Sequence, residues 1–295
     1  MSTHRGSIFL EDAGVLSHTS FKGEQFVLRL HAPKAAAAAT PGSFVHIRCG
    51  PTVPMRRPLS IMRTDAGEGW LELLYRPVGA GLLRLTQAAP GDTLSVLAPI
   101  GNGFTLDLSR PRVIAIGGGV GIPPMLFLAE ELMRQADCEP WVLMGSEVPF
   151  PFDLVPAVLA AERAGNGARW QQARALESLE SAGVPSLTAT NAELDGVSKG
   201  YVTDIARQLL EDMTETDRAR TQIAACGPGP MLRATAKLAR AFELPCQIAL
   251  EEYMACGVGG CAGCTVPVHT GDQVAMKRVC VDGPVFEARE IYPAA

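Results

Sequence analysis

The sequence has no excess of positive charge. Its 26 basic and 31 acidic residues give a formal net charge of −5, whereas a nucleic-acid-binding domain usually carries a basic patch or stripe. Charged residues make up 19% of the chain and hydrophobic residues 47%, a balance typical of globular proteins and not of disordered ones. We therefore expect a folded protein that binds no nucleic acid.

Long uninterrupted hydrophobic runs are missing as well. The most apolar segment, residues 113–129, is broken by glycines and two prolines, whereas a membrane-spanning helix needs about 20 mostly apolar residues. Residues 1–14 contain no apolar stretch followed by small residues, so no signal peptide is expected. The sequence therefore predicts a cytoplasmic protein without a membrane segment.

Cysteine is too sparse for a disulfide scaffold. Eight cysteines in 295 residues fall well below the density of small secreted domains. In a reducing compartment, clustered cysteines are more typical of metal ligands than of disulfides. Histidine is also sparse: the five histidines, at positions 4, 18, 31, 46 and 269, lie far apart, and we interpret them as structural or solvated.

What the sequence does contain is a change of pattern along its length. Residues 1–106 hold short apolar runs separated by turn sequences, which predicts a small antiparallel β-barrel. Residues 107–245 alternate apolar strands with helical spacing, which predicts an α/β domain with a parallel sheet. Residues 246–295 are rich in cysteine and glycine and form a third, small module. Within the α/β part, residues 154–161 and 169–182 are expected to be extra surface helices.

The cysteine module carries the strongest signal. Four residues separate Cys256 from Cys261, two separate Cys261 from Cys264, and fifteen separate Cys264 from Cys280. This is the spacing of plant-type [2Fe–2S] ligation. Most of the residues between the first three cysteines are glycines, which allow one short loop to turn several thiolates toward a common centre. A structural zinc site and unrelated free thiols are the alternatives.

A second motif lies in the β-rich half. Arg57-Pro58-Leu59-Ser60 is followed by the strand end Leu74-Tyr75-Arg76, and then by a glycine-rich helix start at residues 79–81. Such a helix start offers backbone N–H groups to a phosphate. We expect Arg57 and Arg76 to supply charge to a pyrophosphate and Ser60 to hydrogen-bond a flavin ring, although a purely structural role is the alternative.

A third motif begins the α/β part. A glycine loop at Gly117, Gly118, Gly119 and Gly121 follows a strand and precedes a helix, the context in which a backbone approaches a dinucleotide. A later strand ends in Cys226-Gly227-Pro228, again at the edge where ligands of such sheets bind. Glu147 follows another strand: a carboxylate near the ribose favours NAD over NADP, and an exposed loop acid with no role is the alternative.

The order of these motifs resembles that of ferredoxin-reductase-type flavoproteins. The chain carries in turn RPLS, GNGF, GGGVGIPP, CGPGPM and EEYMACGVGGCAGCTVP with CVDGPVF. The last module and GNGF are most similar to the electron-transfer subunits of NAD-dependent dihydroorotate dehydrogenase. The resemblance implies a flavin-binding barrel (residues 1–106), an NAD-binding α/β domain (107–245) and a [2Fe–2S] module (246–295).

The resemblance also implies a role for particular residues. The expected FAD contacts are Arg57, Pro58, Leu59, Ser60, Leu74, Tyr75, Arg76, Gly81 and Leu82. Leu82 stands where the family commonly has threonine, so a phosphate-binding hydroxyl is lost there. The expected cluster ligands are Cys256, Cys261, Cys264 and Cys280, and the nicotinamide side is expected at Cys226, Gly227 and Pro228, with Cys226 as a neighbour of the flavin.

By this resemblance the protein passes electrons between a partner and NAD. The partner would be an FMN-containing dihydroorotate dehydrogenase subunit in a hetero-oligomer, and the cofactors would be FAD, a [2Fe–2S] cluster and NAD(H). The cofactors carry the chemistry, and the protein supplies position and potential. One alternative is an NAD(P)H-dependent reductase that serves another redox partner, and another is a non-catalytic, zinc-stabilised nucleotide-binding module.

Overall fold

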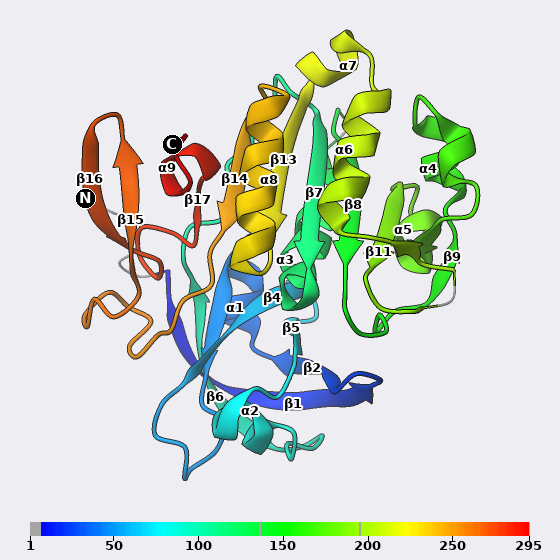
Figure 1. Cartoon of the computed structure of the whole chain (residues 1–295). Coiled ribbons are helices and arrows are strands. Elements are labelled where there is room, and N and C mark those ends of the chain that lie inside the picture. The colour runs from blue at the N-terminus through cyan, green and yellow to red at the C-terminus, as the bar shows by residue number, and fades with distance from the viewer. Residues whose placement is uncertain (1–6, 136, 195, 295) are drawn as a thin grey trace. The chain divides into compact units, whose positions relative to one another are not determined.

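The computed structural model describes residues 7–135, 137–194 and 196–294 (Figure 1). His4, interpreted above as structural or solvated, lies outside the described residues. The chain divides into two compact units: residues 1–104 with 249–286, and residues 105–248 with 287–295. The first unit thus joins the β-rich part and the cysteine segment from distant parts of the sequence. The division into three modules stays a prediction.

The first unit is built on a closed antiparallel barrel, as the sequence predicts. Its strands, in the order in which they pair, are β1 (Phe9–Phe21), β2 (Gln25–His31), β5 (Trp70–Tyr75), β4 (Arg57–Asp65), β3 (Phe44–Ile47) and β6 (Thr93–Ile100). Two short helices, α1 (Pro33–Ala38) and α2 (Gly79–Leu85), connect strands. Leu28, Leu30 and Leu73 are among the side chains that fill the interior, because alternate residues of each strand point inward.

The cysteine segment of this unit contains an antiparallel hairpin between Cys264 and Cys280. Strands β15 (Thr265–Thr270) and β16 (Gln273–Arg278) pair with each other. Asn102, which follows β6, fastens the segment to the barrel: its side-chain amide donates to the carbonyls of Val281 (3.0 Å) and Asp282 (3.2 Å), and its backbone N–H donates to Gly283 (2.7 Å). The asparagine of the GNGF motif therefore holds the turn that follows Cys280.

The second unit contains the predicted parallel sheet. Its seven-stranded sheet has the order β12 (Ser198–Lys199), β11 (Ser186–Thr190), β8 (Glu139–Gly145), β7 (Arg112–Gly118), β13 (Thr221–Cys226), β14 (Cys246–Ala249) and β17 (Val285–Glu287). The last strand straddles the division between the units. The pairs of β7 with β8 and β13 and of β8 with β11 are parallel, and β13 is buried along its whole length, as expected for a strand covered on both faces.

Helices cover this sheet and connect its strands. They are α3 (Ile122–Met133), preceded by the 3₁₀ turn η1 (Gly119–Gly121), then α6 (Val202–Asp212), α7 (Glu215–Ala219), α8 (Gly229–Ala241) and α9 (Ala288–Ile291). In Figure 1, α6 and α8 lie side by side over the strands. Among the described residues, no helix is long and apolar enough to cross a membrane.

The prediction of two extra helices between residues 154 and 182 is only partly right. The helices there are α4 (Val158–Arg163), the 3₁₀ turn η2 (Gly167–Trp170) and α5 (Glu177–Ser181), but β9 (Leu154–Pro156) and β10 (Arg174–Leu176) form a two-stranded antiparallel sheet. Ala175 and Leu176 are fully buried. A three-residue strand is too short to show alternation, so its pairing was hidden in an alanine-rich sequence.

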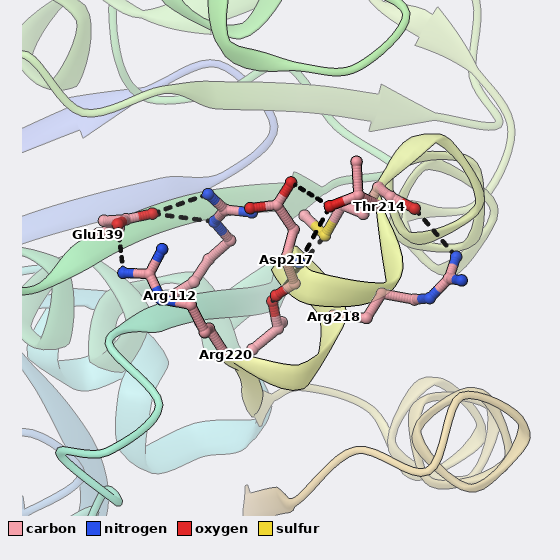
Figure 2. Close-up of polar contacts among 8 residues, drawn as sticks. Arg112, Glu139, Thr214, Asp217, Arg218 and Arg220 are labelled. Atoms are coloured by element: carbon pink, nitrogen blue, oxygen red, sulfur yellow. Dashed lines mark hydrogen bonds and ion pairs between the residues drawn. The ribbon is translucent and has the colours of Figure 1, made fainter.

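An ion-pair network closes the sheet at the edge where β7 and β8 begin (Figure 2). Arg112 pairs with Glu139 and with Asp217 of α7, each at 2.8 Å, and Arg220 also reaches Glu139 (3.0 Å). Thr214 caps α7 and donates its hydroxyl to Asp217 (2.8 Å). The Thr214 hydroxyl, together with the guanidinium of Arg112, holds the pKa of Asp217 below its ordinary value.

We expect Arg112→Ala to lower the free energy of unfolding by about 1–3 kcal/mol, because it leaves two carboxylates without their shared partner. Urea unfolding followed by tryptophan fluorescence measures this. The matched control is Arg134→Ala, whose pair with Glu131 is more exposed and which should change stability by less than about 0.5 kcal/mol. Equal losses in the two variants would contradict this interpretation.

The same network predicts a loss of stability in acid. The pKa of Asp217 is lower in the folded than in the unfolded chain, so its contribution is complete above the ordinary aspartate value of about 3.9 and disappears as the pH falls through the lowered value. We expect Asp217→Asn to flatten this part of the pH dependence of unfolding. A variant with the same acid profile as wild type would show that the pair with Arg112 does not carry it.

Candidate functional site: a cysteine loop, an arginine cradle and a glycine edge

The four cysteines of the predicted cluster motif come together in two pairs. The Sγ atoms of Cys264 and Cys280 lie 3.4 Å apart, and both side chains are buried. The backbone N–H of Cys261 donates to the Sγ of Cys256 (3.4 Å), and Cys261 is exposed. Cys264 and Cys280, which are sixteen positions apart in the sequence, are therefore neighbours in space. Cys256 and Cys261, which belong to one short loop, are neighbours as well.

The loop backbone is arranged to stabilise thiolate at its first cysteine. Burial raises the pKa of Cys256, but hydrogen bonds from the backbone N–H groups of Val258, Cys261 and Gly260 outweigh it and lower the pKa to about 7. Burial, with the neighbouring Cys264 thiol, raises the pKa of Cys280 to about 12. Cys256 is therefore poised to lose its proton, whereas Cys280 holds its proton until a metal displaces it.

Glycine conformation and one outside side chain, that of Arg278, hold the shape of the loop. Gly257 and Gly259 have φ values of +70° and +80°, a conformation that glycine adopts without strain. The guanidinium of Arg278 donates to the carbonyl of Gly259 (3.1 Å), while the backbone N–H of Arg278 donates to Asp282 (2.7 Å). The loop is thus tied to the β15–β16 hairpin through its carbonyl groups, which leaves its N–H groups free to face sulfur.

His46 is a residue of this site that sequence reasoning missed. It lies in β3 with 0% of its surface exposed, and a Cβ on Gly257 would stand 2.8 Å from its Nδ1. Burial and the nearby Arg56 guanidinium lower the pKa of His46, although the backbone of Cys256 and Met254 acts in the opposite direction. The signal in the sequence was a histidine in a four-residue strand that is otherwise apolar.

The thiol set fits a two-iron cluster. Each iron of a [2Fe–2S] centre needs two protein thiolates, and the structure offers the thiols as two pairs. Among the residues that the structure describes, no three histidine, cysteine or acidic side chains are arranged around one point as a single metal ion requires. The backbone N–H groups directed at sulfur suit a cluster whose charge is stabilised by such donors.

The predicted flavin motif meets the predicted helix start in the same unit. The guanidinium of Arg57, on β4, lies directly against Gly81 of α2: a Cβ at Gly81 would stand 2.7 Å from its Nε and 2.9 Å from its Nη2. The Nη1 of Arg57 donates to the carbonyl of Met55 (2.8 Å). Because α2 has only seven residues, the charge of Arg57 and the close backbone matter more here than a helix dipole.

Arg57 and Gly81 form what we call the arginine cradle. The other residues predicted to contact FAD differ in whether their side chains or only their backbone can reach a ligand. Leu59, Leu74 and Tyr75 are buried in the barrel, so at these positions the backbone is what a ligand can reach. The hydroxyl of Tyr75 is 3.0 Å from Nε2 of His18, and burial raises its pKa. Half-buried side chains remain at Arg57, Pro58, Ser60, Arg76 and Leu82.

The glycine motif of the second unit is packed where only glycine fits. A Cβ on Gly121 would lie 2.3 Å from the carbonyl oxygen of Cys226, and one on Gly118 would lie 2.5 Å from Sδ of Met231. Gly117 and Cys226 are register partners of the parallel strands β7 and β13. Both predicted nucleotide motifs therefore meet at the carboxyl edge of the sheet, where open α/β sheets bind ligands. Glu147 is exposed after β8, another strand that ends there.

Comparison with solved structures identifies the class of protein. The chain is similar to the structure titled NADH-dependent reduced ferredoxin-NADP oxidoreductase, with 25% identity, a TM-score of 0.75, and coverage of 95% of this chain and 90% of that one. A ferredoxin NADP+ reductase from Neisseria gonorrhoeae, at 15% identity and a TM-score of 0.57, shares the fold over 81% of this chain and 92% of its own. The fold and the cysteine loop thus define an iron–sulfur member of the ferredoxin-reductase-like proteins.

Sequence comparison identifies the family. Residues 251–292 match the iron-sulfur cluster binding domain of dihydroorotate dehydrogenase B. The chain is 32% identical to the dihydroorotate dehydrogenase B (NAD(+)) electron transfer subunit of Desulforamulus reducens, over 95% of this chain and 97% of that protein. It is 36% identical to the subunit of the same name from Bacillus caldolyticus, over 85% and 86%. The chain belongs to the family of dihydroorotate dehydrogenase B electron transfer subunits, and the predicted fold class and family are confirmed.

We expect Gly257→Ala to reduce the iron content of the protein, measured after anaerobic reconstitution, to less than about half that of wild type. A side chain at this φ is strained by about 1–2 kcal/mol, and its Cβ would meet His46. Gly260→Ala is the matched control, because a Cβ there has open space around it and the backbone N–H is kept. The expectation fails if both variants bind the same amount of iron.

Proposed function

We propose that this chain is the electron-transfer subunit of an NAD-linked dihydroorotate dehydrogenase of pyrimidine biosynthesis. It carries FAD and a [2Fe–2S] cluster and passes electrons between an FMN-containing catalytic subunit and NAD. The observation that carries the proposal is the meeting of four thiols, in two pairs, in the unit that also holds the arginine cradle. Membership of the family supports the assignment of partner and nucleotide.

The proposed cluster ligands are Cys256, Cys261, Cys264 and Cys280. When bound, the cluster exchanges single electrons and the flavin exchanges both single electrons and hydride, so the pair joins one-electron to two-electron chemistry. The protein supports this by directing N–H groups of the loop at sulfur and by burying Cys264 and Cys280 away from water. The N–H groups stabilise negative charge added at the site, whereas burial works against that charge but keeps water away from the sulfurs.

The proposed FAD site is the cradle of Arg57 and Gly81. A guanidinium suits a pyrophosphate because its planar donors match two phosphate oxygens. The absence of a side chain at Gly81 lets the guanidinium and the ligand share one small space. Ser60, half-buried and two strand positions from Pro58, supplies a hydroxyl for the flavin edge. Leu82 contributes only its backbone N–H.

The proposed NAD site is the carboxyl edge of the sheet in the second unit. Gly117, Gly119 and Gly121 let the pyrophosphate approach the backbone, and Gly227 and Pro228 continue this edge. Cys226 ends β13 as a buried thiol and is proposed as a neighbour of the nicotinamide. Glu147, exposed after β8, favours NAD because its carboxylate accepts a hydrogen bond from a ribose hydroxyl and repels a 2′-phosphate.

A protein partner is part of the proposal. Around the cysteine loop, Tyr253 is 94% exposed, and Val258, Val274 and Met276 also present apolar surface. Apolar groups gathered on one segment are typical of a surface that another protein covers. A hetero-oligomer in the cytoplasm, where a reducing environment keeps cluster thiolates intact, accounts for these features.

We expect the tagged chain, purified from its host, to bring with it an FMN-containing subunit and to reduce NAD⁺ when dihydroorotate is added. Dihydroorotate gives up two electrons and two protons, NAD⁺ takes a hydride, and one proton is released. NADP⁺ should react more slowly because of Glu147.

Cys264→Ser should lower this activity by more than about tenfold, and Cys138→Ser, in the other unit, should leave it unchanged. Isolation with a different redox enzyme and no orotate formed would instead support a reductase that serves another partner.

For the flavin site, we expect Arg57→Ala to weaken FAD binding by about tenfold or more, which corresponds to the loss of one charged contact of about 1.4 kcal/mol. The dissociation constant follows from the quenching of flavin fluorescence. Arg63→Ala is the control: Arg63 lies on the same strand and faces Glu72 at 3.9 Å. Equal affinities of the two variants would remove Arg57 from the site.

A further inference from the structure

One side chain connects the strand beside the arginine cradle with the cysteine loop. His46 lies in β3, where its register partner on β4 is Pro58 of the RPLS motif. Its ring lies beneath Gly257, at 2.8 Å (Nδ1) and 3.2 Å (Cγ) from the position of a Cβ. All of these residues belong to the first unit. Gly257 follows Cys256 directly, so the imidazole supports the loop at its first thiol.

The peptide groups of the cysteine loop share one orientation. Peptide N–H and C=O groups of a trans peptide point to opposite sides. In this loop the N–H groups face the sulfur of Cys256, and the Gly259 carbonyl points away, toward Arg278. Arg278 therefore holds one carbonyl of the loop. The carbonyls before Gly257 need a donor on the barrel side.

His46 is placed to be that donor. A neutral imidazole carries one N–H donor and one acceptor, and within the part of the chain that the structure describes neither ring nitrogen of His46 makes a hydrogen bond. The ring is fully buried, where an unmade hydrogen bond is costly. The backbone groups of Cys256, Met254 and Arg56 face it closely enough to act on its charge, and the first two of these belong to the cysteine segment.

We propose that His46 is a positioning residue for the [2Fe–2S] cluster: in the loaded protein its imidazole N–H donates to a backbone carbonyl at Met254 or Cys256 and so keeps the loop N–H groups directed at sulfur. N–H groups that point at the sulfurs stabilise the reduced, more negative cluster and raise its potential. Loss of the imidazole lets the loop peptides turn, and the potential falls. This inference rests on the cluster ligands of the proposed function.

The test is an EPR-monitored redox titration of the full chain loaded with its cluster. His46→Phe keeps a ring but no donor, and we expect its ratio of reduced to oxidised cluster at a fixed potential to fall about tenfold, which is about 59 mV for one electron. His46→Asn places an amide donor near the position of Nδ1 and should recover at least half of this shift. His269→Phe makes the same chemical change in β15 and should leave the ratio as in wild type.

The outcomes separate this inference from the proposed function. A loaded His46→Phe protein with the wild-type ratio overturns the role of His46, and so do equal shifts in the Phe and Asn variants, because packing alone would then explain them. A wild-type chain that binds no iron overturns the proposed function instead.

If His46→Phe does not retain its cluster, hydrogen exchange of the loop amides, residues 254–261, in the cluster-free full chain decides. Faster exchange in His46→Phe that His46→Asn reverses supports the proposal. Exchange equal to wild type, or equally fast in both variants, contradicts it.

Discussion

The first unit depends on how the peptide groups of one short loop, the cysteine loop after Cys256, are oriented. Its N–H groups must face the sulfur of Cys256, so its carbonyls must be satisfied elsewhere. Arg278 holds Gly259 from the hairpin side, and Asn102 fastens the turn after Cys280 to the end of the barrel. The barrel therefore has a structural task besides its proposed one as the flavin site. It is also the rigid body against which the thiols are held, and this explains why the cysteine segment joins it in one compact unit.

The second unit is organised by two opposite edges of one sheet. At the edge where the strands end, Gly121 lets its backbone lie against that of Cys226, and Gly118 leaves room for the side chain of Met231. At the edge where they begin, Arg112 joins Glu139 to Asp217. Ion pairs thus hold the edge where the strands begin, and glycine packing shapes the edge where they end. In open α/β sheets the second of these edges is where dinucleotides bind.

Much of the fold and of the candidate site was predictable, because the sequence patterns that indicate them each lie within a short stretch of the chain. The cysteine spacing and the two glycine motifs each lie within a few residues, and the alternation of apolar runs distinguished barrel from parallel sheet. The RPLS motif and the glycine-rich helix start were expected to serve one phosphate, and the structure shows Arg57 against Gly81. His46 could not be recognised, because its role depends on Gly257, more than two hundred positions away. Asn102 belongs to the GNGF motif on which the resemblance partly rests, but its bonds to residues 281–283 join positions at least 179 apart in the sequence. The pairing of β9 with β10 was too short to leave a pattern.

The division of the chain between the two units has a consequence for biogenesis. Residues 1–104 and 249–286 build one unit, and residues 105–248 come between them. During translation the barrel strands emerge long before the cysteines, because six of the seven strands of the second unit's sheet lie between them in the sequence. All six barrel strands can therefore pair before the thiols that dock against them are made. Such an order shortens the time for which reactive sulfurs stand exposed to oxidants.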